Sequence, residues 1–185
     1  MGTIIICDQE WLAENINKGN MINSSINQTD NPTIEKYCYD NNQNNCDLYR
    51  GMYQWNEMMN YTSSEGARGI CPSGFHIPTE SEWQQLINNL GGVDAAGSKL
   101  KESGTDHWHY PNDASDESHF TALPGGYLTA DGLFSSINRN VCYWTSTDNG
   151  NTNYAFYRML FYNNSEVPRT FGNKSIACYV RCIKD

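Results

Sequence analysis

The stretch from Gly69 to Leu90 constrains the fold of this chain more than any other, because it contains a strongly signalled helix start. Thr79 and Glu82 have capping-box spacing, so the Thr79 hydroxyl can accept a hydrogen bond from the Glu82 N–H while the Glu82 carboxylate reaches back. Pro78 stops any helix before that point. The apolar residues that recur at helical spacing are Trp83, Leu86, Ile87 and Leu90. The sequence therefore predicts a principal helix over 79–90 with one buried side.

Extended segments are indicated at four other places. Phe75-His76-Ile77 predicts a short extended entry to the helix, after a turn that starts at Cys71. The longest β-like run is Tyr154–Tyr162, and the apolar or aromatic residues on both of its faces predict a central strand covered on both sides. Ile4–Ile6 and Val180–Ile183 are short and apolar, and we expect these terminal strands to lie close together.

Length and composition limit the function classes. A chain of 185 residues is expected to form a single domain over 1–185 with a core of its own, and we expect a monomer. The net charge of −9 and the pI near 4.8 argue against a nucleic-acid partner. No apolar run approaches the roughly 20 residues that a membrane span requires. Abundant Tyr and Asn with few charges suit an extracellular β-rich or mixed domain.

Seven cysteines are many for a cytosolic chain. No Cys-x2-Cys occurs and no histidine is paired with a cysteine at ligand spacing, so disulfides in an oxidising compartment are favoured over a zinc site. Cys38 and Cys46 flank a polar segment, and a hairpin loop there would bring them within disulfide reach. If Cys178 and Cys182 lie on one strand they cannot pair, because four residues extend about 13 Å and the Cα limit is about 7 Å.

Several motifs resemble those of one known family. Residues 69–86 resemble the signature of the Fibrobacter succinogenes major paralogous domain, G-I-C-P-x-G-W-H-x-P-[ST]-x-x-E-W-x-x-L, with Phe75 in place of the usual Trp. Phe120–Tyr127 is similar to the F-S-A-L-P-[AG]-G-Y of that family, and Tyr179–Asp185 to its S-V-R-C-V-K-D. Residues 77–83 also resemble the L-P-T-E-A-E-W of formylglycine-generating-enzyme-like domains, which have the C-type-lectin-like fold.

This resemblance implies an α+β fold. We expect a single C-type-lectin-like domain, in which a twisted, mostly antiparallel sheet packs against the helix over 79–90. Matching family positions also imply the disulfides Cys38–Cys46 and Cys71–Cys182. Cys178 then needs another partner, for which we choose Cys142, and this choice leaves Cys7 free.

A departure from the formylglycine-generating pattern favours a binding function over a catalytic one. Formylglycine-generating enzymes use a pair of cysteines upstream of a terminal G-F-R-C-like strand, but here Cys182 lies in that strand and Cys178 is only four residues before it. No Gly-x-Ser-x-Gly is present, and we assign no catalytic residue. We therefore expect a non-catalytic module that recognises a glycan or a protein partner. The alternatives are an enzyme of the formylglycine-generating type and a purely structural surface domain.

The expected location is secreted or at the cell surface. No signal peptide is present, and Met1-Gly2 is typical of an initiation site that replaces one. We expect that the natural chain is anchored through a removed N-terminal signal or a lipoprotein segment.

The expected ligand-binding segment is 144–170, since lectin-like domains commonly present ligands with the segment before the last strand. It combines Asn-rich turns with tyrosine rings and two arginines, which suit sugar faces and protein epitopes alike. The predicted contacts are Trp144, Asn149, Asn151, Asn153, Tyr157, Arg158, Tyr162, Asn163, Asn164 and Arg169.

Metal binding has weaker support. Asp113, Asp116 and Glu117 lie in one acidic loop and are candidate calcium ligands, but no EF-hand pattern is present and a solvated loop is favoured. His107 and His109 alternate as a strand pair would, without a third ligand at suitable spacing. No cofactor other than calcium is expected.

Overall fold

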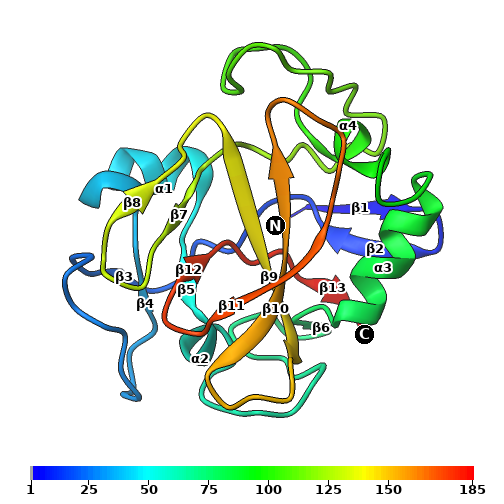
Figure 1. The fold of residues 1–185 in the computed structure, drawn as a ribbon. Helices are drawn as coiled ribbons and strands as arrows, with labels where there is room; N and C mark the ends of the chain where they lie inside the picture. Colours follow the sequence, from blue (N-terminus) through cyan, green and yellow to red (C-terminus); the bar gives the residue numbers. More distant parts are fainter. Residues whose placement is uncertain (1) are drawn as a thin grey trace.

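Short strands make up most of the regular structure of this chain (Figure 1). The computed structural model describes residues 2–185, and Met1, on which the expectation of a replaced signal peptide rests, lies outside them. The strands are β1 (Thr3–Ile6), β2 (Gln9–Leu12), β3 (Asn20–Met21), β4 (Glu35–Lys36), β5 (Tyr53–Gln54), β6 (Phe75–His76), β7 (Tyr127–Leu128), β8 (Phe134–Ser135), β9 (Asn140–Asp148), β10 (Tyr154–Phe161), β11 (Arg169–Asn173), β12 (Ala177–Cys178) and β13 (Ile183–Lys184). The helices are α1 (Gln43–Tyr49), α2 (Trp55–Met58), α3 (Glu80–Asn89) and α4 (Ala96–Leu100), with a 3-10 helix at Tyr39–Asn41.

The architecture is mixed α/β and mostly antiparallel, as the sequence predicts, but four small sheets replace the single twisted sheet that we expected. Their strand orders are β1-β2-β13-β6, β11-β10-β9, β5-β12-β7-β8 and β3-β4, and the last pair is parallel. Most of these strands have only two residues, so few ladders extend beyond one or two pairs. The sheets are therefore separate patches around a common interior.

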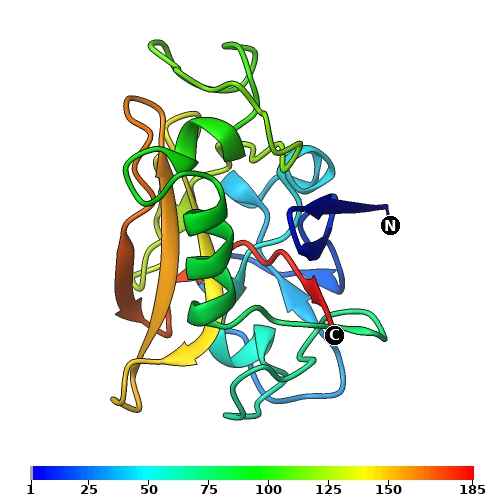
Figure 2. The ribbon, with the colours of Figure 1, turned by 90° about the vertical axis from the view of Figure 1, so that its right-hand side faces the viewer.

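The two ends of the chain meet in one sheet, as expected. β2 pairs with β1 on one side and with β13 on the other, and β13 also pairs with β6 (Figure 2). The predicted strand Val180–Ile183 is wrong in its bounds, because regular pairing is confined to β12 and β13. The backbone between them bonds to the end of β2 and the residues just after it: the carbonyl of Val180 accepts from Ile16 N–H at 2.8 Å, and that of Cys182 from Leu12 N–H at 3.0 Å.

The predicted capping box is present at the start of α3. The Thr79 hydroxyl accepts a hydrogen bond from the Glu82 N–H at 3.2 Å, and the Glu82 carboxylate accepts one from the Thr79 N–H at 2.7 Å. The same carboxylate contacts His76 Nε2 at 2.9 Å, which ties the helix start to β6. The helix ends before Gly91, whose φ of 105° is in a region that favours glycine.

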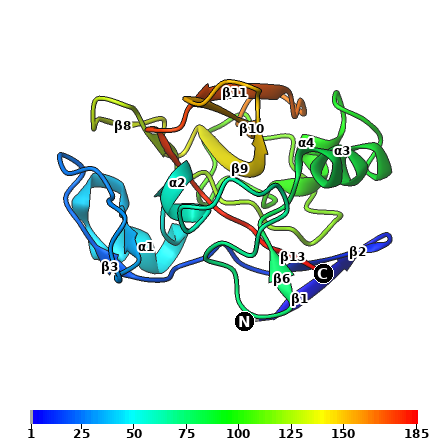
Figure 3. The ribbon, with the colours of Figure 1, turned by 90° about the horizontal axis from the view of Figure 1, so that it is seen from below.

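A cluster of aromatic rings forms the centre of the core. α3 lies between the terminal sheet and the sheet of β9, β10 and β11 (Figures 2 and 3), and Trp83 of this helix touches rings from both sides. Its ring centroid lies 5.1 Å from that of Trp11 in β2 and 5.4 Å from that of Tyr143 in β9. Phe120 packs against all three of these rings at 5.6–6.0 Å. Tilted and edge-on pairs of this kind contribute beyond the burial of their area.

β10 is the central strand of its sheet, with β9 and β11 on either side. The expectation that both of its faces are covered is correct for only part of its length. Arg158 and Leu160 are buried, but Tyr154 at the start of the strand is exposed. The hairpin from β10 to β11 is formed as expected, with Phe156 opposite Phe171.

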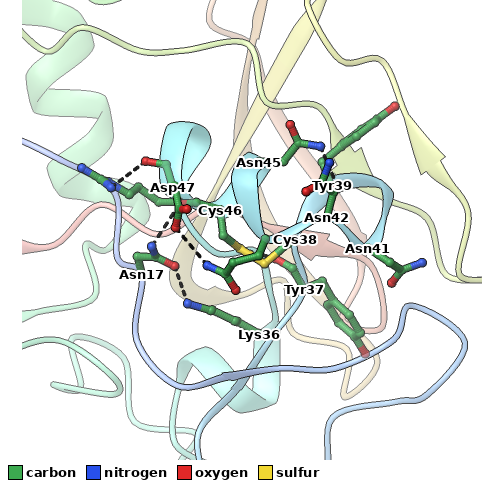
Figure 4. The surroundings of a disulfide bond; sticks show 12 residues. Asn17, Lys36, Tyr37, Cys38, Tyr39, Asn41, Asn42, Asn45, Cys46 and Asp47 are labelled. Carbon is green, nitrogen blue, oxygen red and sulfur yellow. Dashed lines mark hydrogen bonds between the residues drawn. A yellow bond between two sulfur atoms is a disulfide. The ribbon is translucent and has the colours of Figure 1, made fainter.

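All three predicted disulfides are present, and Cys7 is a free, exposed thiol. The segment between Cys38 and Cys46 is not the hairpin loop that we expected, because it contains the 3-10 helix and the first turn of α1 (Figure 4). Asn42 caps α1, since its side-chain oxygen accepts the Asn44 N–H. Asparagines that favour a turn also favour a helix cap, and local sequence does not separate the two.

The disulfides should differ in their contribution to stability. Replacing both Cys71 and Cys182 by Ser should lower the free energy of unfolding by about 5 kcal/mol, because this bridge spans a separation of 111 residues. The pair Cys38–Cys46, with a separation of 8, should contribute about 2.5 kcal/mol. Urea unfolding of the two double-serine variants measures both losses, and equal losses would contradict the loop-entropy argument.

Candidate functional site

The predicted ligand-binding residues do not form one site. Asn149, Asn151 and Asn153 lie in the β9–β10 turn at the bottom of Figure 1, whereas Asn163 and Asn164 lie in the connection at the opposite end of β10. β10 has eight residues, so its ends are roughly 24 Å apart. A small ligand therefore contacts one end only, and the predicted set has to be divided.

Two members of the predicted set are inaccessible. Trp144 is fully buried and its Nε1 donates to the carbonyl of Tyr53 at 2.9 Å. Arg158 is buried in an ion pair with Glu80 of α3, and it also donates to the side-chain oxygen of Gln84 at 2.9 Å. The expectation that these two side chains contact a ligand is corrected, because neither reaches the surface.

Tyr157, Tyr162 and Arg169 of the predicted set each contact another side chain of the protein. Tyr157 is half-buried and its ring packs edge-on against Trp144 at 5.8 Å. Tyr162 lies under the guanidinium of Arg139 at 5.3 Å, and Arg169 is exposed and bonded to Glu80 at 3.1 Å.

The turn asparagines have a structural function that the sequence did not indicate. The side-chain oxygens of Asn149, Asn151 and Asn164 each accept the N–H two residues ahead, at 3.0–3.1 Å. These Asx-turns shape the loops and leave the amide NH2 groups available.

The candidate metal ligands point to separate partners. Asp113 accepts from Lys101 Nζ at 2.7 Å, and hydrogen bonds from Lys101 and Ser165 lower its pKa against the opposing effect of burial. Asp116 bonds to the hydroxyl of Thr121, Glu117 pairs with Lys99, and His107 pairs with Glu102 while His109 bonds to a backbone carbonyl. Within residues 2–185, no three His, Cys, Asp or Glu side chains come together as a metal site.

The strongest candidate site is a polar groove at the lower end of the molecule in Figure 1, which we call the amide groove. It consists of two adjoining cavities of about 290 and 470 Å3, which share Asn56, Tyr61, Thr152 and Lys174 as lining residues. The remaining lining residues are Asn27, Gln28, Gln54, Trp55, Glu57, Thr62, Ser63, Asp148, Asn153, Asn173 and Ser175. Amide and hydroxyl groups thus dominate its wall.

A pair of buried glutamines fixes one side of this groove. The Gln28 N–H donates to Gln54 Oε1 at 3.1 Å, and the Gln54 N–H donates to Gln28 Oε1 at 2.7 Å. Gln54 Nε2 also bonds to Asn27 and to the carbonyl of Ser175. This reciprocal bonding joins the loop before β4, strand β5 and the turn after β11, and it holds this wall of the groove together.

The opposite wall contains strained backbone and a buried carboxylate. Asn60 and Tyr61 both have φ near +50 to +60°, which is unusual for an aromatic residue and costs about 1–3 kcal/mol. Tyr61 is held there because its N–H donates to the carbonyl of Asn56 at 2.8 Å and its hydroxyl donates to Glu57 at 2.7 Å. Burial raises the pKa of Glu57 although the Glu35 N–H and Tyr61 hydroxyl oppose this effect.

A lysine ammonium lies in the groove without an acidic partner. Lys174 Nζ is 3.9 Å from the centroid of the Trp55 ring, a cation–π contact, and it forms no ion pair with any residue in the described range. Burial lowers the pKa of Lys174, and the charge of Asp148 opposes this shift. Trp55 is itself anchored, since its Nε1 donates to the carbonyl of Thr145 at 2.9 Å. The cation is therefore positioned over a fixed ring and retains donors for a ligand.

Another cavity, of about 340 Å3, has a structural explanation. It is lined partly by Arg181, a buried residue whose guanidinium donates to the carbonyls of Leu12, Ala13 and Phe120 and to the side-chain oxygen of Asn15. These bonds join the end of β2 to the loop before β7. Here the donors of Arg181 hold two parts of the fold together. Several side chains of the amide groove, in contrast, form no hydrogen bond within residues 2–185.

The sequence indicated only one residue of the amide groove in advance, Asn153. Gln54, Asn56, Tyr61 and Lys174 were missed, because they are up to about 120 residues apart along the chain and share no pattern. One local signal was available: Asn173-Lys174-Ser175 is a polar turn directly after a strand, a common place for binding residues.

The fold and the groove define a disulfide-linked, mixed α/β domain with a polar surface site. Within residues 2–185 no helix is both long and apolar enough to cross a membrane. The model of the Fibrobacter succinogenes major domain family matches residues 4–184, and the chain belongs to this family. No curated protein and no solved structure matches the chain.

The raised pKa of Glu57 leads to a pH-dependent prediction. The folded state holds a proton on Glu57 more tightly than the unfolded chain does, so the contribution of this residue to stability falls as the pH rises from its ordinary pKa of 4.5 through the raised value. Glu57→Gln lacks this titration. The variant should therefore gain stability relative to the wild type as the pH rises above the ordinary pKa of 4.5.

Urea unfolding of both proteins at pH values below and above this pKa measures the difference. The other titrating groups are present in both proteins, so their contributions to the pH dependence cancel in the difference between the two unfolding free energies. A difference in unfolding free energy that stays constant with pH would contradict the assignment.

Proposed function

We propose that this chain is a non-catalytic binding module that recognises a glycan in the amide groove. The observation that carries this proposal is the set of unused hydrogen-bonding groups there. Asn56, Thr152, Asn153 and Lys174 all line the groove, and none of their side chains forms a hydrogen bond with another residue of the described chain. Sugar hydroxyls both donate and accept, so amides, a hydroxyl and an ammonium are suitable partners for them.

The rigidity of the groove supports the same proposal. Its wall is fixed by the paired glutamines and by the Glu57–Tyr61 contact, so little conformational entropy is lost when a ligand binds. The backbone of Tyr61 has a strained, positive φ, and such strained residues are often found at ligand-binding sites. A protein partner needs a larger and less polar contact area than this groove offers, which favours a glycan.

The proposal includes the fold type and location. We take the fold as C-type-lectin-like, on the resemblance in sequence and on the terminal strands that share one sheet. Three disulfides support a secreted or cell-surface location, with attachment through an N-terminal signal or lipoprotein segment. The formylglycine-generating alternative has little support, because Cys142, Cys178 and Cys182 are all in disulfides and the free Cys7 lies apart from the groove.

A glycan array with the folded chain tests the function, and groove variants test the site. Lys174→Met and Asn56→Ala should each weaken binding of the glycans that the array identifies by roughly tenfold, since each removes one or two hydrogen bonds. Both residues are at the surface of the groove, so the melting temperature should change by only a few degrees.

The matched control is Arg139→Met. Arg139 also lies over an aromatic ring, that of Tyr162, but at the other end of β10. Its replacement should leave glycan binding unchanged. Binding that survives both groove variants, or that is lost in the control, would place the site elsewhere, and an array without any bound glycan would refute the function.

A further inference from the structure

Three aromatic rings form an exposed patch next to the amide groove, which we call the ring platform. It consists of Tyr154 and Phe156 of β10 and Phe171 of β11. Phe171 is 57% exposed and Tyr154 is 37% exposed, which is unusual for large rings on a central hairpin. The Phe171 ring packs against both of the others: its centroid lies 6.2 Å from that of Tyr154 and 6.3 Å from that of Phe156, in edge-on geometry.

The strand register places this platform on one continuous surface with the groove. Tyr154 is opposite Asn173, and Phe156 is opposite Phe171. Residues that are opposite each other, or two apart along a strand, point to the same face of a sheet. Asn173 lines the amide groove, so the platform begins where the groove ends.

The platform is the uncovered half of a sheet face. Farther along β10, Arg158 and Leu160 point to the same side and are buried, and Arg158 bonds to α3 there. α3 starts at Glu80, and Arg169 extends from β11 to this residue at 3.1 Å while its guanidinium lies 3.9 Å over the Phe156 ring. Arg169 thus covers the Phe156 ring and joins it to the start of α3.

We propose that the platform is a second part of the binding site, and that the ligand is a saccharide chain of several units rather than a single sugar. The inference rests on the proposed function of the amide groove. Sugar rings have an apolar C–H face and polar edges, and such a face packs on an exposed aromatic ring. The positions from Arg169 to Asn173 extend over roughly 13 Å, which is longer than one sugar ring.

The chemistry of the surroundings favours a saccharide over a second protein surface. The platform is bounded by the polar groove at one end and by the Arg169–Glu80 ion pair at the other, so no large apolar area continues beyond the rings. Stable protein interfaces bury about 800 Å2 on each partner with an apolar centre. Three rings between polar groups suit a narrow, amphipathic chain better.

The test compares chain lengths on the platform variants. The full chain is titrated by calorimetry with two series of hexose oligomers, one α-1,4-linked and one β-1,4-linked, in which the short form has two units and the long form has six. The glycans bound on the array are also titrated, each in a short and a long form. The wild type should bind the long form of at least one series about tenfold more tightly than its short form. Phe171→Ala and Tyr154→Ala should abolish this gain and leave affinity for the short form unchanged.

Ile5→Ala is the control, since Ile5 is a strand residue with 75% exposure on a different sheet, and it should keep the full gain. Equal affinity for short and long forms, or a gain that survives both platform variants, would overturn the inference. If short forms still bind and depend on Lys174, the proposed function stands without the platform. If no saccharide binds, both proposals fail, and a protein ligand becomes the better explanation.

Discussion

The buried ion pair between Glu80 and Arg158 is the contact on which the arrangement of the surface depends. It joins the first turn of α3 to the central strand β10, and the Arg158 side chain also donates to the carbonyl of Val167 at 3.2 Å. Burial raises the pKa of Glu80 and lowers that of Arg158, while each partner opposes the shift of the other. Loss of one partner would leave a buried charge unpaired, at a cost of about 3–5 kcal/mol. The pair holds the first turn of α3 against β10, and so affects which half of the sheet face remains open.

Buried polar side chains join distant segments at other places in this chain too, which has little regular structure. Arg181 donates to three backbone carbonyls from two segments, and Lys101 donates to the carbonyls of Phe161 and Asn164 as well as to Asp113. Gln28 and Gln54 bond reciprocally beside the groove. Such side chains replace the ladders that longer strands would supply, because buried backbone groups must be paired in some way. Together with three disulfides they make irregular loops rigid enough to carry a site.

Prediction of the candidate site from sequence was limited for a physical reason. Composition drew attention to Asn153, which lines the amide groove, because polar turns next to strands are often exposed. It could not exclude Arg158, since whether an arginine is paired and buried depends on a carboxylate 78 residues away. Nor could it find Lys174, because the Trp55 ring under its ammonium is brought there only by the fold. Spacing along the chain contains no information on such distant contacts.

The sequence by itself determined the features that depend on neighbouring residues or on a family pattern. The capping box of Thr79 and Glu82 forms from residues three apart, and the amphipathic stripe of α3 follows from its periodicity. The family and two of the disulfides followed from matched positions, and the third disulfide followed from the choice of Cys142 as the partner of Cys178. Only the tertiary structure decided that strands form four sheets, that the predicted ligand residues lie at opposite ends of β10, and that an amide groove adjoins exposed rings. Those outcomes depend on which distant segments pack together, and packing is decided by the whole chain at once.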